Sequence, residues 1–225
     1  MKKLLGAVLA LSVSCSVAFA EGKTRKEIRK ERMEIRKWSE KERKAKVDQS
    51  IRKEAKRLAK AGWEVKPGAM PLEKQLERSY VMQFEFDENL LPKYFMGEAS
   101  SVGENFDAAR IAAHSLAMND LAGQIQTEVT ALTENTVANQ QLSPEEAASL
   151  TETVMSSKSL ISQSIGRTIP VIECFRINEK KNTEVLVRIA YNSELALAAA
   201  KKAVRAELER KGLNLHEQLD RVLGE

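Results

Sequence analysis

Cysteine and histidine are scarce in this chain, with two of each among 225 residues. Two cysteines are too few for a disulfide framework, and two histidines nearly exclude a histidine-rich metal site. Hydrophobic residues make up 43% of the chain and charged residues 30%. That balance excludes both a bundle of membrane spans and a wholly disordered chain. The composition predicts one domain with a core of its own, together with an appendage.

Motifs that carry catalytic chemistry are also missing. The sequence has no Gly-rich phosphate loop, no Cys-x-x-Cys, no His-Glu-x-x-His and no Gly-x-Ser-x-Gly. His114 and His216 are far apart in the chain, and Cys174 lies in an apolar, strand-like run. Neighbouring carboxylates such as Glu145 and Glu146 are better explained by helix capping than by acid–base catalysis. We therefore predict no catalytic, cofactor-binding or metal-binding residues and no enzyme activity.

The first 20 residues have the pattern of a secretory signal peptide. Lys2 and Lys3 precede an apolar run over residues 4–19, and small residues at positions 18 and 20 precede Glu21. The apolar run is short for a stable membrane span, which needs about 20 residues. We expect cleavage after Ala20, no membrane span in the mature chain, and export to the periplasm, the outer membrane or the medium.

Cys15 opens an alternative, in which the chain becomes a lipoprotein. The residues before it, Ser12-Val13-Ser14, match the pattern before a lipidated cysteine only loosely. The residues after it stay apolar, whereas a lipidated terminus normally becomes polar at once. Cleavage after Ala20 is therefore the favoured prediction, with lipidation of Cys15 as the less favoured one.

Charge divides the rest of the chain into two parts. Residues 21–62 hold 17 Lys or Arg against 8 Asp or Glu, while residues 63–225 hold 17 against 24. We predict a basic arm over 21–62 and an acidic domain over 63–225. Opposite charges four residues apart favour a long solvated helix in the arm, as at Lys23/Glu27, Lys30/Glu34, Glu40/Lys44, Glu42/Lys46 and Asp48/Arg52. The apolar stripe is too interrupted for a coiled coil, but Ile51, Ala55 and Leu58 predict that the last two turns dock on the domain.

Two roles are open for the arm. It is either a charged spacer or coat on the domain's acidic surface, or a contact to anionic lipid, lipopolysaccharide or cell-wall polymer. Nucleic acid is disfavoured, because the chain is expected outside the cytosol and Trp38 is the arm's one aromatic residue. The candidate polyanion-binding residues are Arg25, Lys26, Arg29, Lys30, Arg36, Lys37, Arg43 and Lys44.

The acidic domain alternates helical and strand patterns. We predict a helix from Pro71 to about Gln83, a strand over 93–101 and an alanine-rich helix over about 105–125. Residues 126–137 fit a continuing helix and a strand equally well. Ser143-Pro144-Glu145-Glu146 predicts a capped helix to about Lys158.

A hairpin follows, with strands over 168–177 and 183–191, in which Val185, Val187, Ile189 and Tyr191 share one face while Glu184 and Arg188 are on the other. A final helix begins at Asn192 or Ser193 and ends at Gly212, before a short amphipathic tail. The predicted fold class is α+β, with a small antiparallel sheet of about three to four strands packed with helices and preceded by a long charged N-terminal helix.

The order of strand, alanine-rich helix, variable segment, strand pair and final helix resembles a family of exported bacterial envelope proteins. The resemblance depends on Ala109-Arg110, Ala112-Ala113, Ala117, Leu121-Ala122, Gln124-Ile125 and the strand over 184–190. The family includes the LPP-type 20-kilodalton lipoproteins and the amino-terminal domain of the flagellar protein FlgT. The resemblance covers roughly residues 93–208 and implies a small antiparallel sheet backed by helices and an envelope location, with no catalytic residues. The whole chain also resembles uncharacterised secreted proteins of Gram-negative anaerobes.

We therefore predict a non-enzymatic exported envelope protein that binds an unidentified envelope protein or itself. The first alternative is an adaptor whose basic arm attaches to an anionic polymer or membrane surface. The less favoured alternative is a cell-wall hydrolase, which would need a cleft with two facing carboxylates.

Overall fold

The computed structural model describes residues 30, 33, 34, 37, 49–87, 91–138 and 142–223. The predicted signal peptide over 1–20, with Cys15, lies outside these residues. So do six of the candidate polyanion-binding residues, namely Arg25, Lys26, Arg29, Arg36, Arg43 and Lys44. Lys30 and Lys37 are described, and both are exposed.

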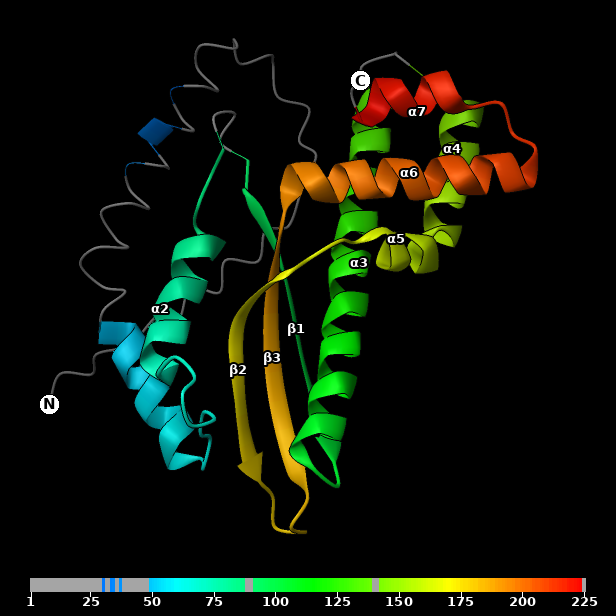
Figure 1. The fold of residues 1–225 in the computed structure, drawn as a ribbon. Coiled ribbons are helices and arrows are strands. Elements are labelled where there is room, and N and C mark those ends of the chain that lie inside the picture. The colour runs from blue at the N-terminus through cyan, green and yellow to red at the C-terminus, as the bar shows by residue number, and fades with distance from the viewer. Residues whose placement is uncertain are drawn as a thin grey trace, which may run out of the picture.

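The centre of the fold is a three-stranded antiparallel sheet in the order β1-β3-β2 (Figure 1). Its strands are β1 (Tyr94–Gly103), β2 (Ile169–Ile177) and β3 (Thr183–Asn192). The predicted hairpin is confirmed as β2 and β3, and the predicted strand over 93–101 as β1. In the hairpin turn the Asn178 side chain accepts hydrogen bonds from the backbone N–H groups of Lys180 and Asn182. The α+β fold class is confirmed.

One face of the sheet is covered by α3 (Phe106–Ala138), the long green helix of Figure 1. Its buried ridge begins with Ala109, Ala113 and Ala117, all 0% exposed. Alanines bring the helix backbone close to the strands, because a larger side chain would hold it away. The ridge packs against the inward row of β3, whose members are Val185, Val187, Ile189 and Tyr191 as predicted.

Residues 126–137, which fitted helix and strand equally, belong to α3. Val129 and Thr133 are both fully buried, four residues apart on the inner face. The Thr133 hydroxyl donates to the carbonyl of Val129, and Thr127, Thr130 and Thr136 make the same bond to the carbonyl four residues before each. These bonds satisfy the hydroxyls within the helix, so threonines that favour strands elsewhere are accommodated here.

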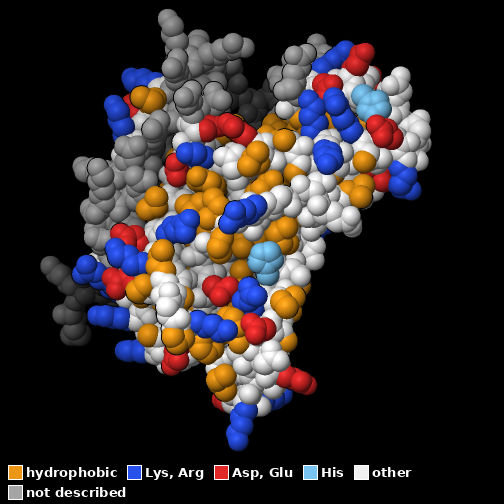
Figure 2. Space-filling view, in the orientation of Figure 1, with side chains coloured by type: hydrophobic (Ala, Val, Ile, Leu, Met, Phe, Trp, Pro, Cys, Tyr) orange, Lys and Arg blue, Asp and Glu red, His pale blue; other side chains and the backbone are white. Residues whose placement is uncertain are grey.

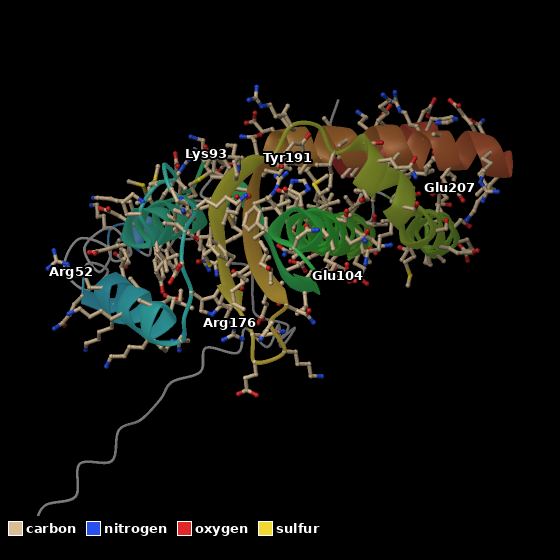
Figure 3. The ribbon with its side chains drawn as sticks, turned by 60° about the horizontal axis from the view of Figure 1, so that its bottom comes forward. Arg52, Lys93, Glu104, Arg176, Tyr191 and Glu207 are labelled. Carbon is tan, nitrogen blue, oxygen red and sulfur yellow. The ribbon has the colours of Figure 1, made fainter. Side chains whose placement is uncertain are left out.

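The opposite face of the sheet carries a second layer, made by α2 (Leu72–Gln83) and the helix over residues 49–60. A second apolar core fills the space beneath it. In that core Ile51 and Leu76, from the helical layer, are 2% and 1% exposed, and they pack with Ile172 and Cys174 of β2. Figure 3 shows these two helices on one side of the strands and α3 on the other. The predictions of a helix ending at Gln83 and of docking by the last turns of the arm are both confirmed.

The remaining helices gather beyond one end of the sheet: α4 (Pro144–Ser156), α5 (Lys158–Ser164), α6 (Ser193–Lys211) and α7 (His216–Leu223) (Figure 1). The predicted capping box is present, with Ser143 and Glu146 each accepting a hydrogen bond from the other's backbone N–H. Asn192 caps α6, and Gly212 ends it in the left-handed conformation at φ 67°. Within the described residues, no helix is long and apolar enough to cross a membrane.

Candidate functional site

The middle of the outer edge of β2, at Glu173 and Phe175, is closed by neighbouring segments. Glu64 and Phe175 exchange two backbone hydrogen bonds, of 2.7 and 2.8 Å. The side-chain oxygen of Gln75, a buried residue of α2, accepts the next outward N–H, that of Glu173, at 2.7 Å. The Gln75 amide nitrogen in turn donates to the carbonyl of Met70. These bonds use the groups through which another strand would pair.

The first half of β1 is closed in a different way, by two side chains of α3. The Asp120 carboxylate accepts the backbone N–H of Glu98 at 3.1 Å, and the Gln124 amide donates to the carbonyl of Met96 at 2.9 Å. Both bonds reach over the edge of the sheet rather than across its face. In an antiparallel edge strand, every second residue points its backbone N–H and C=O groups outward. Because Met96 and Glu98 do so, the next residues of β1 with outward groups are the second and fourth after Glu98.

The second half of β1 leaves its outward backbone groups open. Ser100 and Val102 continue the series begun by Met96 and Glu98, and they pair with Leu186 and Glu184 of β3 in register. No other described segment bonds to their outward N–H and C=O groups. Their side chains are exposed, with Val102 at 52%. We call residues 100–103 the open edge; such an edge is able to pair with an added strand.

A charged cluster lies beside the open edge, on the face of the sheet that carries α2. Arg188 of β3 forms an ion pair with Glu98 of β1, its cross-strand partner, and donates to the hydroxyl of Ser79 at 2.6 Å. Ser79 is fully buried, while Glu98 is exposed. The cluster therefore connects α2 to the strand whose edge is open and restricts its movement. Glu184 and Arg188 are on this face, as predicted.

A second surface feature is a basic ridge, defined here as Lys53, Lys56, Arg57 and Lys60. The steps of three and four residues place these cations on one face of the helix over 49–60. All four are exposed, while Ile51 on the opposite face is buried in the second core. Figure 2 shows Lys and Arg side chains along the margin where this helix lies.

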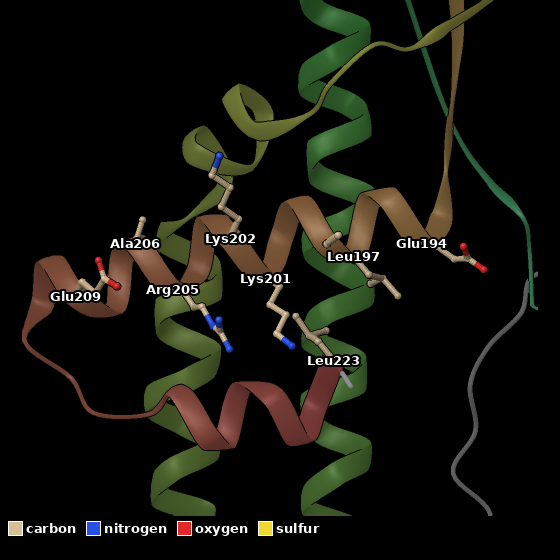
Figure 4. Close-up of a pocket in the computed structure, with 9 residues that line it drawn as sticks. Glu194, Leu197, Lys201, Lys202, Arg205, Ala206, Glu209 and Leu223 are labelled. Carbon is tan, nitrogen blue, oxygen red and sulfur yellow. The ribbon is translucent and has the colours of Figure 1, made fainter. Parts of the chain in front are cut away.

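A groove of about 840 Å³ is lined by α6 and by Leu223 of α7. Figure 4 shows Lys201 and Arg205 pointing into it from α6, with Leu223 opposite on α7. Both cations bind Asp220, with nitrogen–oxygen distances of 2.9 Å for Lys201 and 2.7 Å for the second oxygen with Arg205. Hydrogen bonding to Lys201 is the main cause that lowers the pKa of Asp220. These charges compensate one another and join the two helices.

The residues that the sequence raised as chemical candidates do not converge. His114 is exposed on α3 and His216 lies on α7, and the described residues contain no group of His, Cys, Asp or Glu that could hold a metal ion. Burial, followed by the nearby charges of Glu98 and Glu173, raises the pKa of the Cys174 thiol to about 12. A thiol with that pKa stays protonated and unreactive at neutral pH.

The acidic pair on α4 has a structural task. Glu146 accepts the backbone N–H of Ser143 and the amide of Gln218 on α7, and these hydrogen bonds lower its pKa. Glu145 adds negative charge to the first turn, where the helix dipole favours it. This arrangement agrees with the capping interpretation.

The sequence did not single out the open edge or the basic ridge. The ridge had a readable signal, because four cations at helical spacing face away from Ile51, Ala55 and Leu58. The open edge had no local signal in the sequence. Its existence depends on which strand pairs with β1 and on how far along β1 the side chains of α3 bond to its backbone.

No family model, curated protein or solved structure matches the chain. The resemblance to the LPP-type lipoproteins and the FlgT amino-terminal domain stays a prediction.

Proposed function

We propose that the protein is a non-enzymatic, exported envelope protein that binds a protein partner, or a second copy of itself, by strand addition at the open edge of β1. The observation that carries this proposal is the contrast between the two edges of the sheet. Gln75 and Glu64 close the middle of β2, and Asp120 and Gln124 close the start of β1. The end of β1 is left with exposed side chains and open backbone groups.

The surroundings of the edge support this function. The ion pair between Glu98 and Arg188, together with Ser79, holds β1 in place before any partner arrives, which lowers the entropy cost of binding. Leu116 of α3 lies one helical turn before Asp120, which bonds to the β1 edge, and its side chain is 49% exposed. An added strand gains affinity from backbone hydrogen bonds and specificity from side-chain contacts of this kind.

The chemistry of the candidate catalytic groups supports a role without catalysis. Cys174 is buried with a raised pKa, and Glu146 serves as a helix cap. For the hydrolase alternative, a cleft with paired carboxylates would be required. The groove between α6 and α7 instead carries Lys201 and Arg205, compensated by Asp220.

The experiment is site-specific photocrosslinking in the cells that make the protein. A photoreactive amino acid is placed at Ser100 on the open edge or, as a control, at Lys180 in the exposed hairpin turn. We expect a discrete crosslinked product from position 100 alone. Val102→Pro removes one outward N–H while remaining compatible with an edge strand, so it should abolish that product, whereas Val102→Thr should retain it. Equal crosslinking from both positions, or a product that persists in Val102→Pro, would contradict strand addition.

A second candidate function is attachment through the basic arm. It is favoured by the rigid base that the arm receives: the Tyr80 hydroxyl donates to Glu54 at 2.7 Å, and Ile51 is buried beneath the same helix. Removing residues 21–48 preserves both contacts, whereas removing 21–62 would open the second core. If the arm attaches the protein electrostatically, the shortened chain should leave the envelope fraction, and the intact chain should be released by rising salt.

A further inference from the structure

We infer that the basic ridge is a docking surface for the headgroup layer of an anionic phospholipid membrane. Lys53, Lys56, Arg57 and Lys60 form the outward face of the helix over residues 49–60. This inference deepens the second candidate function, because it names the ligand class and moves the contact onto the folded domain. It does not depend on strand addition at β1.

The ridge is fixed in direction because its helix is docked. Ile51 is 2% exposed, and Ala55 and Leu58 pack against the same core. Glu54 accepts the hydroxyl of Tyr80 on α2 at 2.7 Å. The inner face of the helix is therefore committed to the sheet, and the four cations point away from it.

The positive charge of the ridge is largely uncompensated. Lys53, Lys56 and Lys60 make no ion pair with any described residue, and Arg57 reaches Glu54 only at 4.0 Å. That Glu54 carboxylate already accepts the Tyr80 hydroxyl. By comparison, Arg52 on the flank of the same helix pairs with Glu73 at 3.3 Å. The positive charge of the ridge is therefore available to an anionic partner, because it is not neutralised within the described residues.

The shape and composition of the ridge favour a membrane over the other anionic partners. From Lys53 to Lys60 it extends about 10 Å along a straight helix, which suits a plane of headgroups. None of its four residues lines the groove between α6 and α7, where a single polymer chain could be held. Lysine is a point charge without the planar fork that selects one phosphate, and lysine-rich patches are depleted from protein–protein interfaces.

The rest of the domain would orient the molecule on such a surface. Residues 49–60 hold five Lys or Arg against one Glu, whereas residues 84–225 hold 14 against 21. An anionic surface attracts the first set and repels the second, so the summed field turns the ridge toward the membrane. α3 lies on the other side of the sheet from the ridge helix (Figure 3) and therefore faces away from the lipid.

The test measures binding of the chain that begins at Glu21 to vesicles of phosphatidylcholine with or without phosphatidylglycerol. The ridge variant is Lys53→Gln/Lys56→Gln/Lys60→Gln. The matched control, Lys180→Gln/Lys181→Gln/Lys202→Gln, removes the same charge from exposed lysines elsewhere. An arm variant, Lys26→Gln/Lys30→Gln/Lys37→Gln, separates the ridge from the arm. Circular dichroism establishes that each variant is folded.

Each lysine near an anionic membrane contributes about fivefold to binding. We expect wild type to bind only the vesicles with phosphatidylglycerol, and the ridge variant to bind them at least about tenfold more weakly than the control. Equal losses in ridge and control variants would show that net charge alone matters and would overturn the inference. A loss confined to the arm variant would overturn the ridge and retain attachment through the arm. If the ridge is needed for binding to soluble polyphosphate but the protein does not bind vesicles, the partner is not a membrane and the inference is wrong. If wild type binds vesicles with and without phosphatidylglycerol equally, neither the arm nor the ridge binds anionic lipid.

Discussion

Gly97 of β1 lies directly against the backbone carbonyl of Ala117 in α3, so closely that a Cβ on Gly97 would overlap that oxygen. Backbone atoms of two packed elements cannot move aside as a flexible side chain can. This contact sets the distance between the sheet and α3. The alanine ridge of α3 lies beside it and has side chains small enough to allow that distance.

Gly97→Ala should therefore destabilise the domain by at least about 2 kcal/mol, because overpacking forces the helix away from the strand. The matched change Gly123→Ala lies inside α3, where the new Cβ would meet only the flexible Lys158 ammonium at 3.3 Å. Alanine favours a helix over glycine, so this control should be neutral or stabilising by up to about 1 kcal/mol. Urea unfolding measures both, and equal stability of the two variants would contradict the close contact.

The helix over residues 49–60 should behave as part of the folded domain. Ile51→Ala removes a side chain that is 2% exposed from the second core. We expect a loss of about 2–5 kcal/mol in the free energy of unfolding, as for other buried isoleucines. The exposed neighbour Lys53→Ala should change it by less than about 0.5 kcal/mol. If both variants unfold like wild type, the docking of this helix is wrong.

Cys174 should be chemically silent in the native protein. Burial is the main cause that raises its pKa to about 12, and the thiolate is the form that reacts. In the chain that begins at Glu21, Cys174 is the sole cysteine. We expect negligible reaction with a disulfide reagent at neutral pH in buffer and complete reaction in denaturant. Rapid labelling of the folded chain would show that β2 is accessible from the α2 side.

Glu207 should make stability depend on acid pH. Arg210 donates two hydrogen bonds to Glu207, and Ser156 donates one at 3.2 Å. Hydrogen bonding to Arg210 is the main cause that lowers the pKa of Glu207 to about 2 from the ordinary 4.5, against the opposing effect of burial. A carboxylate with a lowered pKa stabilises the fold above its unfolded value and loses that contribution as pH falls through the folded value. Glu207→Gln should therefore unfold more easily than wild type at pH 7, and the difference should shrink as pH falls from about 4.5 toward 2.

The control for that experiment is Glu209→Gln, an exposed position on the same helix. Its unfolding curve should follow wild type across the same pH range. A constant difference between Glu207→Gln and wild type at every pH would mean that the side chain acts through packing rather than charge.

Features with local signals were predictable from the sequence. Ser143 and Glu146 form a reciprocal pair three residues apart, and the hairpin strands alternate on either side of a polar turn. The run over 126–137 was ambiguous, because its threonines and valines fit both periods. Burial of Val129 and Thr133 on one helical face decides it, and the helices that pack on α3, namely α4 to α7, all come later in the chain.

The candidate sites were harder to predict for the same reason. That Arg188 faces away from Val187 follows from alternation, but its partners Glu98 and Ser79 are about 90 and 109 residues distant. The open edge depends on the same long-range pairing of β1 with β3. Most of the candidate basic residues proposed from the arm lie outside the described residues. The basic ridge over 53–60 lies at the end of the arm that docks on the domain.

The pairing of β1 with β3 has a consequence for the order of folding. Tyr94 is registered with Asn192 and Gly103 with Thr183, so the strand between β1 and β2 comes from near the end of the chain. Closing such a long loop is slow, and a chain that emerges from its amino end holds β1 without its neighbour until β3 has appeared. During that interval α3 can form as a helix, but the face of the sheet that it covers in the folded protein is not yet complete. The yield of folded protein should therefore depend most on this interval, during which a chaperone that holds the unfinished chain would protect β1 and α3 until β3 is made.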